Sequence, residues 1–84
     1  ALYSDNHPDI ANSLHNIGLA YADLGKYQEA LKCHEQALEI RKALYSDNHP
    51  DIANSLHNIG FVHRFLGKYQ EALKYTNQAF EIYQ

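Results

Sequence analysis

The feature that most constrains this chain is a duplicated stretch, because residues 1–18 return unchanged as residues 43–60. Residues 24–32 return in the same way as residues 66–74, and four further positions match beyond that block. In total, 31 positions of a 42-residue unit are identical, and two such units fill the 84 residues. A period in this range indicates a repeat array, in which each unit is one supersecondary motif that buries its apolar face against its neighbours.

Each unit carries two apolar stripes with helical spacing. In the first unit, apolar residues recur at steps of four and three from Ile10 to Leu24, as on one face of an α-helix. Pro8 suits the first position of this helix, and Gly25 supplies the left-handed turn that ends it. A second helical stripe begins at Tyr27, and no segment alternates with period two. We therefore predict an all-α single domain over residues 1–84, with helices at residues 8–24, 27–45, 50–66 and 69–83.

Composition argues against several classes of partner. The net charge of −3 offers no basic surface for nucleic acid. No apolar run approaches the roughly 18 residues that would span a bilayer. Cys33 is the only cysteine, so the chain holds no internal disulfide. We expect a cytoplasmic protein with no nucleic-acid or membrane partner. Residues 1–3 copy residues 43–45, the predicted end of the second helix. We therefore also expect either a piece of a longer natural array or a scaffold built or excised from one.

Eight positions of the first unit form a specific pattern, namely Leu14, Ile17, Gly18, Tyr21, Gly25, Tyr27, Ala30 and Ala37. This pattern resembles the tetratricopeptide repeat. The usual period of that repeat is about 34, and the 42-residue period with His-Pro-Asp at the first helix is similar to the longer repeats of kinesin light chains. The resemblance implies an α-α superhelix of two helix-turn-helix repeats with four antiparallel helices. It further implies a concave groove, lined by the first helix of each repeat, that binds an extended or helical segment of a partner protein without catalysis.

The resemblance also assigns candidate groove residues. In the first unit they are Asn12, His15, Asn16, Leu19, Ala22 and Asp23, and in the second unit they are Asn54, His57, Asn58, Phe61, Arg64 and Phe65. Asn16 and Asn58 occupy the position that holds a bound peptide backbone in several tetratricopeptide groups. An amide side chain suits that role because it both donates and accepts hydrogen bonds. The alternative interpretation is that these asparagines form a solvated helix face.

The six histidines and the cysteine give no catalytic or metal pattern. His15 and His57 are one repeat apart, about 10 Å between neighbouring helices, which is too far to share an ion. His57 and His63 are six residues apart and so lie on different helix faces. Cys33 has neither zinc-site spacing nor a nucleophile pattern around it, and no glycine-rich loop could hold a phosphate. We therefore expect no catalytic residue, no metal site and no cofactor.

The second unit departs from the first mainly at residues 61–65 and in its last helix. His63 replaces Tyr21, and Thr76 replaces His34. We expect these two changes to weaken the packing within the second unit. The larger side chains at residues 61–65 would suit either a partner site or a new self-contact.

The last helix carries Tyr75, Phe80 and Tyr83, which a following repeat would normally cover. An uncovered apolar patch marks an interface or an aggregation liability. Because two repeats are fewer than the three or so that arrays usually need, we expect self-association through this face. A C2 homodimer, an end-to-end stack and a swapped form opened at Gly67 all remain open. Two functions also remain open: a self-associating repeat scaffold, and an adaptor fragment that binds a partner peptide in its groove.

Overall fold

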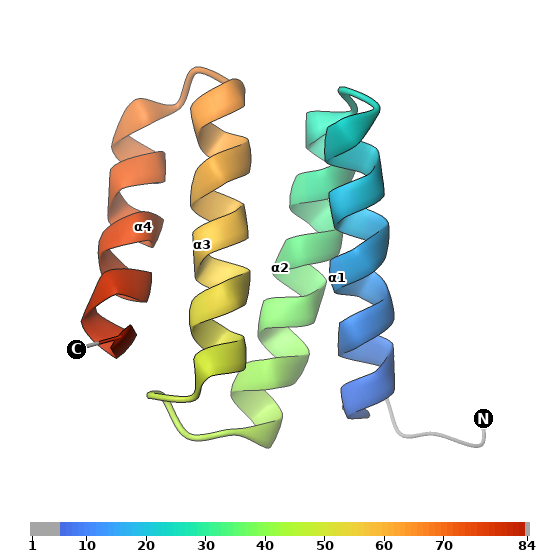
Figure 1. Cartoon of the computed structure of the whole chain (residues 1–84), viewed down its shortest axis with the longest axis vertical. Helices are drawn as coiled ribbons and strands as arrows, with labels where there is room; N and C mark the ends of the chain where they lie inside the picture. Colours follow the sequence, from blue (N-terminus) through green and yellow to red (C-terminus); the bar gives the residue numbers. More distant parts are fainter. Residues whose placement is uncertain (1–5, 84) are drawn as a thin grey trace.

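Four helices lie side by side in chain order in the computed structural model, which describes residues 6–83 (Figure 1). The helices are α1 (Pro8–Asp23), α2 (Tyr27–Leu44), α3 (Pro50–Phe65) and α4 (Tyr69–Tyr83). Each helix packs antiparallel on the next one along the chain, and the described residues contain no strand. The all-α fold of two helix-turn-helix units is therefore confirmed.

The His-Pro-Asp sequence starts α1 and α3 in the same way. The Nδ1 atom of His7 accepts a hydrogen bond of 3.0 Å from the backbone N–H of Asp9, and His49 does the same for Asp51. In both helices a proline occupies the first turn, where its missing N–H would be unpaired in any case. The histidine ring thus satisfies one of the free amides that every helix leaves at its N-terminus.

Two glycines separate the helices of each unit. Gly25 and Gly67 both have φ of +77°, the left-handed region that favours glycine. After Gly25, the N–H of Lys26 donates to the carbonyl of Tyr21 at 2.8 Å, which satisfies a carbonyl at the end of α1. The observed ends of α1, α2 and α3 fall one residue before the predicted ends. In α2 the cause is Tyr45, whose extended backbone cannot continue the helix.

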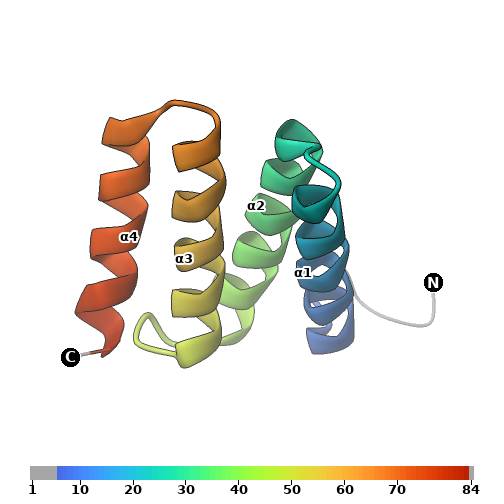
Figure 2. The ribbon, with the colours of Figure 1, turned by 45° about the horizontal axis from the view of Figure 1, so that its top comes forward.

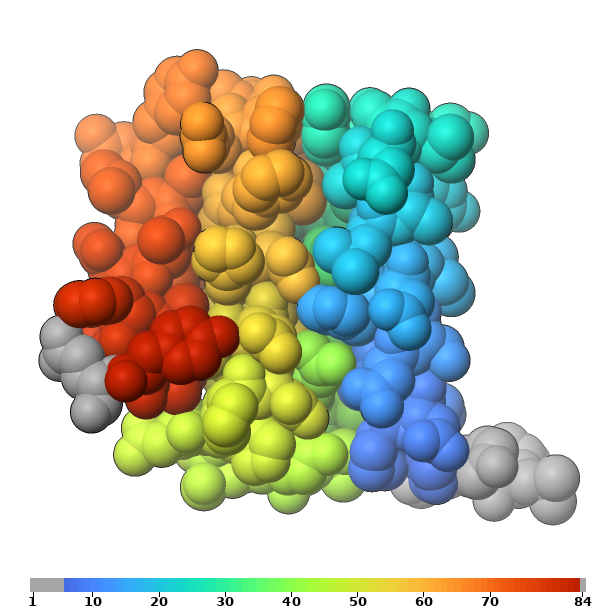
Figure 3. Space-filling model, in the orientation of Figure 1, coloured from blue at the N-terminus to red at the C-terminus, as the bar shows by residue number. Residues whose placement is uncertain are grey.

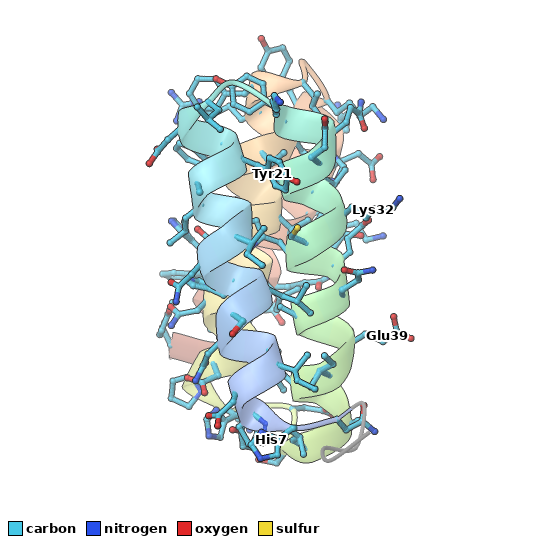
Figure 4. All side chains as sticks on the ribbon, turned by 90° about the vertical axis from the view of Figure 1, so that its right-hand side faces the viewer. His7, Tyr21, Lys32 and Glu39 are labelled. Carbon is cyan, nitrogen blue, oxygen red and sulfur yellow. The ribbon has the colours of Figure 1, made fainter. Side chains whose placement is uncertain are left out.

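The core is centred on α3, which is packed between α2 and α4. Ile52, Ile59 and Val62 of α3 are almost completely buried, and Leu31 and Leu38 of α2 pack against them. Figure 2 shows α1 and α3 on one side of the molecule, with α2 behind them. On the edge seen in Figure 4, polar side chains of α2 point outward to solvent. None of the helices within residues 6–83 has both the length and the apolar character needed to cross a membrane.

Packing within the second unit is rebuilt rather than simply reduced. The ring of His63 stacks on the ring of Tyr75, with 5.5 Å between centroids and 11° between planes. The first unit has Tyr21 and Cys33 at the same two positions. The tyrosine ring therefore lies on α1 in the first unit and on α4 in the second.

Candidate functional site

A hollow of about 240 Å³ lies between α1 and α3, with α2 at its base. Figure 3 shows this face of the molecule, with atoms of α2 visible in the depth between the other two helices. The lining residues are Leu19, Ala22, Asp23, His34, His57, Asn58, Phe61 and Val62. The hollow is thus mainly apolar, with an amide, a carboxylate and an imidazole at its rim.

Aromatic side chains border the end of the hollow near the Gly25 and Gly67 turns. The ring centroids of Phe61 and Phe65 lie 4.9 Å apart, with 52° between the ring planes. Phe65 also stacks on Tyr27, with 5.1 Å between the ring centroids. Both phenylalanines remain about half exposed. Phe65 is held by Tyr27 of α2, whereas Phe61 contributes directly to the lining. An exposed aromatic ring in a fixed position is a typical anchor for a bound side chain.

His34 forms the base of the hollow and is fully buried. It fits because Gly18 has no side chain: a Cβ atom there would lie 2.7 Å from His34 Nε2. Within residues 6–83, His34 Nδ1 has no hydrogen-bond partner. Burial, followed by the nearby His15 and the charge of Arg41, lowers the pKa of His34 to about 4. The ring is therefore neutral at physiological pH.

His15 and Asn58 connect the two sides of the groove. The Nδ2 atom of Asn58 lies 3.5 Å from His15 Nδ1, and the His15 ring meets the His34 ring edge to face at 5.5 Å. Burial lowers the pKa of His15 as well, and Arg41 adds to this effect while Asp51 opposes it. A neutral His15 can accept a weak hydrogen bond from Asn58. The amide of Asn58 is thereby oriented while it still lines the hollow.

The structure brings together only some of the sequence-predicted groove residues. Leu19, Asp23, His57, Asn58 and Phe61 line the hollow, and Phe65 borders it.

The remaining candidates lie outside the lining. Asn12 accepts a hydrogen bond of 3.2 Å from Arg41, and Asn54 accepts one of 3.2 Å from the hydroxyl of Tyr83. Asn16 and Arg64 are exposed and are not part of the lining. Asn16 and Asn58, identical in sequence context, therefore have different surroundings.

Arg41 holds the two units at a fixed spacing, a role that the sequence analysis did not identify. Its side chain is buried and donates to the backbone oxygen of Asp51 at 3.1 Å, to Ser55 Oγ at 2.9 Å and to Asn12 Oδ1 at 3.2 Å. One guanidinium thus connects α1, α2 and α3, whose arrangement forms the groove. The available signal was a charged residue within the apolar stripe of α2, where a buried arginine must be hydrogen-bonded on several sides.

The predicted self-association residues divide into two groups. Phe80 and Tyr83 are exposed on α4, whereas Tyr75 is half-buried against His63. The exposed apolar residues of α4 that the prediction left out are Tyr69 and Leu73. The sequence signal for them was their place in one helical stripe, whose residues recur at steps of four, three, four and three from residue 69 to residue 83. Residue 75 is not part of this stripe.

Within the described part of the chain, no three His, Cys, Asp or Glu side chains come together to form a metal site. A family model for the tetratricopeptide repeat matches residues 9–84. A search of the curated proteins finds no match.

Proposed function

Because the chain belongs to the tetratricopeptide repeat family, we propose that it is a non-catalytic scaffold for protein–protein interaction whose groove binds a segment of a partner protein. The observation that carries this proposal is the hollow between α1 and α3. Its volume of about 240 Å³ is below the roughly 300–1,000 Å³ typical of small-molecule sites. A single bulky apolar side chain of a partner peptide suits it better than a whole metabolite.

The polar rim supports a peptide ligand. Asn58 presents an amide that can donate to a carbonyl and accept from an N–H of one peptide unit. Phe61 and Leu19 on opposite sides of the hollow provide apolar contacts for a side chain between them. The partner segment would therefore combine a bulky apolar side chain with a free backbone amide. We propose the cytoplasm as the site of this activity.

A phage-displayed library of random peptides tests this proposal. We expect enriched peptides to carry a bulky apolar residue, and Asn58→Ala to weaken their binding about tenfold, equivalent to about 1.4 kcal/mol. Asn77→Ala, an exposed asparagine on α4, is the matched control and should bind as the wild type does. Circular dichroism melts would check that both variants fold. Equal binding by the two variants, or no enrichment at all, would contradict the groove proposal.

Self-association is a second candidate function, because an apolar stripe of α4 is exposed. Tyr69, Leu73 and Phe80 are each more than half exposed, and large contiguous patches of this kind mark interaction sites. The near-identity of the two units, whether from recent duplication or from design, also supports association by repetition of one joint. Sedimentation velocity at several concentrations measures it. A mass that stays at that of one chain throughout would exclude it.

A further inference from the structure

The exposed stripe of α4 is the counterpart of the stripe by which α2 packs on α3. A shift of one unit relates Leu73 and Phe80 of α4 to Leu31 and Leu38 of α2. Leu31 and Leu38 are each 9% exposed, whereas Leu73 is 59% and Phe80 is 61% exposed. The whole stripe of α4 comprises Tyr69, Leu73, Thr76, Phe80 and Tyr83, all exposed. Among residues 6–83 no helix covers this stripe, and Leu31 and Leu38 of α2 are matched on α4 by apolar residues, not by polar ones.

The complementary half of the same joint is exposed on α1. On α3, Ile59 and Ser55 are completely buried. The equivalent residues of α1, Ile17 and Ser13, are exposed, Ile17 to 47%. Residues 10–18 of α1 are identical to residues 52–60 of α3. α1 therefore presents the same side chains that receive α2 inside the molecule.

We propose that α4 of one copy packs on α1 of a second copy as α2 packs on α3 within the chain. This inference rests on the proposed self-association and specifies its geometry. The two halves of the joint lie on opposite edges of the molecule (Figure 1). A contact between two different patches is heterologous and adds copies in one direction instead of closing a two-fold dimer. The product is an open, head-to-tail stack whose interface continues the interface already present between α2 and α3.

One substitution makes the joint between copies weaker than the internal one. Inside the chain, Arg41 donates to Asp51 and Ser55 across the joint. Its counterpart on α4 is Tyr83, whose hydroxyl donates to Asn54 within its own unit. The joint between copies therefore lacks the buried guanidinium and its hydrogen bonds.

The end of the joint near the turns differs as well. Phe65 stacks on Tyr27 in the internal joint. In the stack, Tyr69 of the first copy takes the place of Tyr27, and Asp23 of the second copy takes the place of Phe65. A carboxylate replaces an aromatic ring, so a stacking contact is lost. We expect assembly to be reversible and to depend on concentration.

Two variants that each block one half of the joint test this geometry. Phe80→Glu introduces a charge on the α4 stripe, and Ile17→Glu introduces one on the exposed face of α1. Both residues are exposed in the single chain, so both variants should fold, which circular dichroism would verify. Asn77→Glu is the matched control, because Asn77 is exposed on α4 and its counterpart in the internal joint, Glu35 of α2, is itself an exposed glutamate.

Sedimentation velocity should show wild-type and Asn77→Glu masses that rise with concentration beyond two chains. Each blocked variant alone should sediment as one chain of 9.6 kDa. A mixture of the two variants should form a one-to-one complex of twice that mass that grows no further, since it contains one intact α4 stripe and one intact α1 face.

Three results would overturn the proposal. If Ile17→Glu still dimerises alone, then α4 pairs with itself in a two-fold dimer. If Phe80→Glu still associates alone, then the joint does not use the α4 stripe. A wild-type protein that is monomeric at every concentration would refute self-association as well, whereas the first two results would refute the head-to-tail geometry alone.

Discussion

The buried imidazole at the base of the groove makes a sharp prediction about pH. His34 lies against Gly18 and next to His15, and its pKa is lowered to about 4 from an ordinary value of 6.5. In the unfolded chain the ring binds a proton below about pH 6.5. In the folded protein it stays neutral until about pH 4. Between these values the unfolded state binds more protons, so the free energy of unfolding falls as the pH falls.

The size of the effect follows from the displacement of the pKa. Each pKa unit corresponds to about 1.4 kcal/mol, so the stabilisation present above pH 6.5 and lost at pH 4 amounts to about 3 kcal/mol. Lowering the pH from about 7.5 to about 5 crosses some 1.5 units of this window and should remove about 2 kcal/mol. That is a large part of the roughly 5–15 kcal/mol typical of small domains. The lowered pKa of His15 acts in the same direction.

Urea denaturation followed by circular dichroism at the two pH values measures this loss. His34→Thr is the informative control, because threonine stands at the equivalent position 76 opposite Gly60. The variant keeps the other histidines and all carboxylates, so the difference between its pH dependence and that of the wild type isolates His34. We expect the variant to lose about 2 kcal/mol less than the wild type on acidification. Equal losses in the two proteins would show that burial of His34 does not control its protonation.

Two further substitutions test the contacts around this site. Gly18→Ala should lower the free energy of unfolding by about 1–3 kcal/mol, since its Cβ atom would lie 2.7 Å from the His34 ring. In a His34→Ala background the same change should stabilise the protein by up to about 1 kcal/mol through helix propensity. The absence of this reversal in thermal melts would refute the steric account. Arg41→Lys should cost about 2 kcal/mol in urea titrations, because an ammonium group cannot reach all three acceptors of the guanidinium. Lys42→Arg, at an exposed residue, is the control and should change the free energy of unfolding by less than about 0.5 kcal/mol. Comparable effects of Arg41→Lys and Lys42→Arg would argue against the hydrogen-bond network.

The sequence was sufficient for the four helices and their first residues, while the predicted ends of α1, α2 and α3 were one residue too late. The spacing of apolar residues located all four helices, and the glycines and prolines located the turns. These signals act within a few residues, so they are readable from a short stretch of chain. The His-Pro-Asp caps are also local, since each histidine accepts a hydrogen bond from an amide two residues further along the chain.

The candidate site was less predictable, because its chemistry depends on contacts between helices. Asn16 and Asn58 have the same neighbours in sequence, yet Asn58 lines the hollow and lies near His15, while Asn16 is exposed. Ile17 and Ile59 differ in the same way. The difference is the helix packed beside each residue, since α2 packs on α3 while within residues 6–83 no helix takes the equivalent place on α1. Arg41 shows the same limit, since its three acceptors lie on two other helices.

The distribution of identical and variable positions divides the joint from part of the groove. Residues 10–18 and 52–60, which form the receiving side of the joint, are identical in the two units, while residues 19–23 and 61–65 differ at every position. The variable segment contributes Leu19, Asp23 and Phe61 to the hollow. Groove chemistry can therefore change from one repeat to the next while residues 52–60 of the surface on which the previous helix packs stay the same, although Phe65, which stacks on Tyr27, belongs to both. In a stack of copies, the hollow between neighbouring molecules would contain Phe65 and Arg64 in place of Asp23 and Ala22, so assembly would present grooves of two different chemistries in alternation.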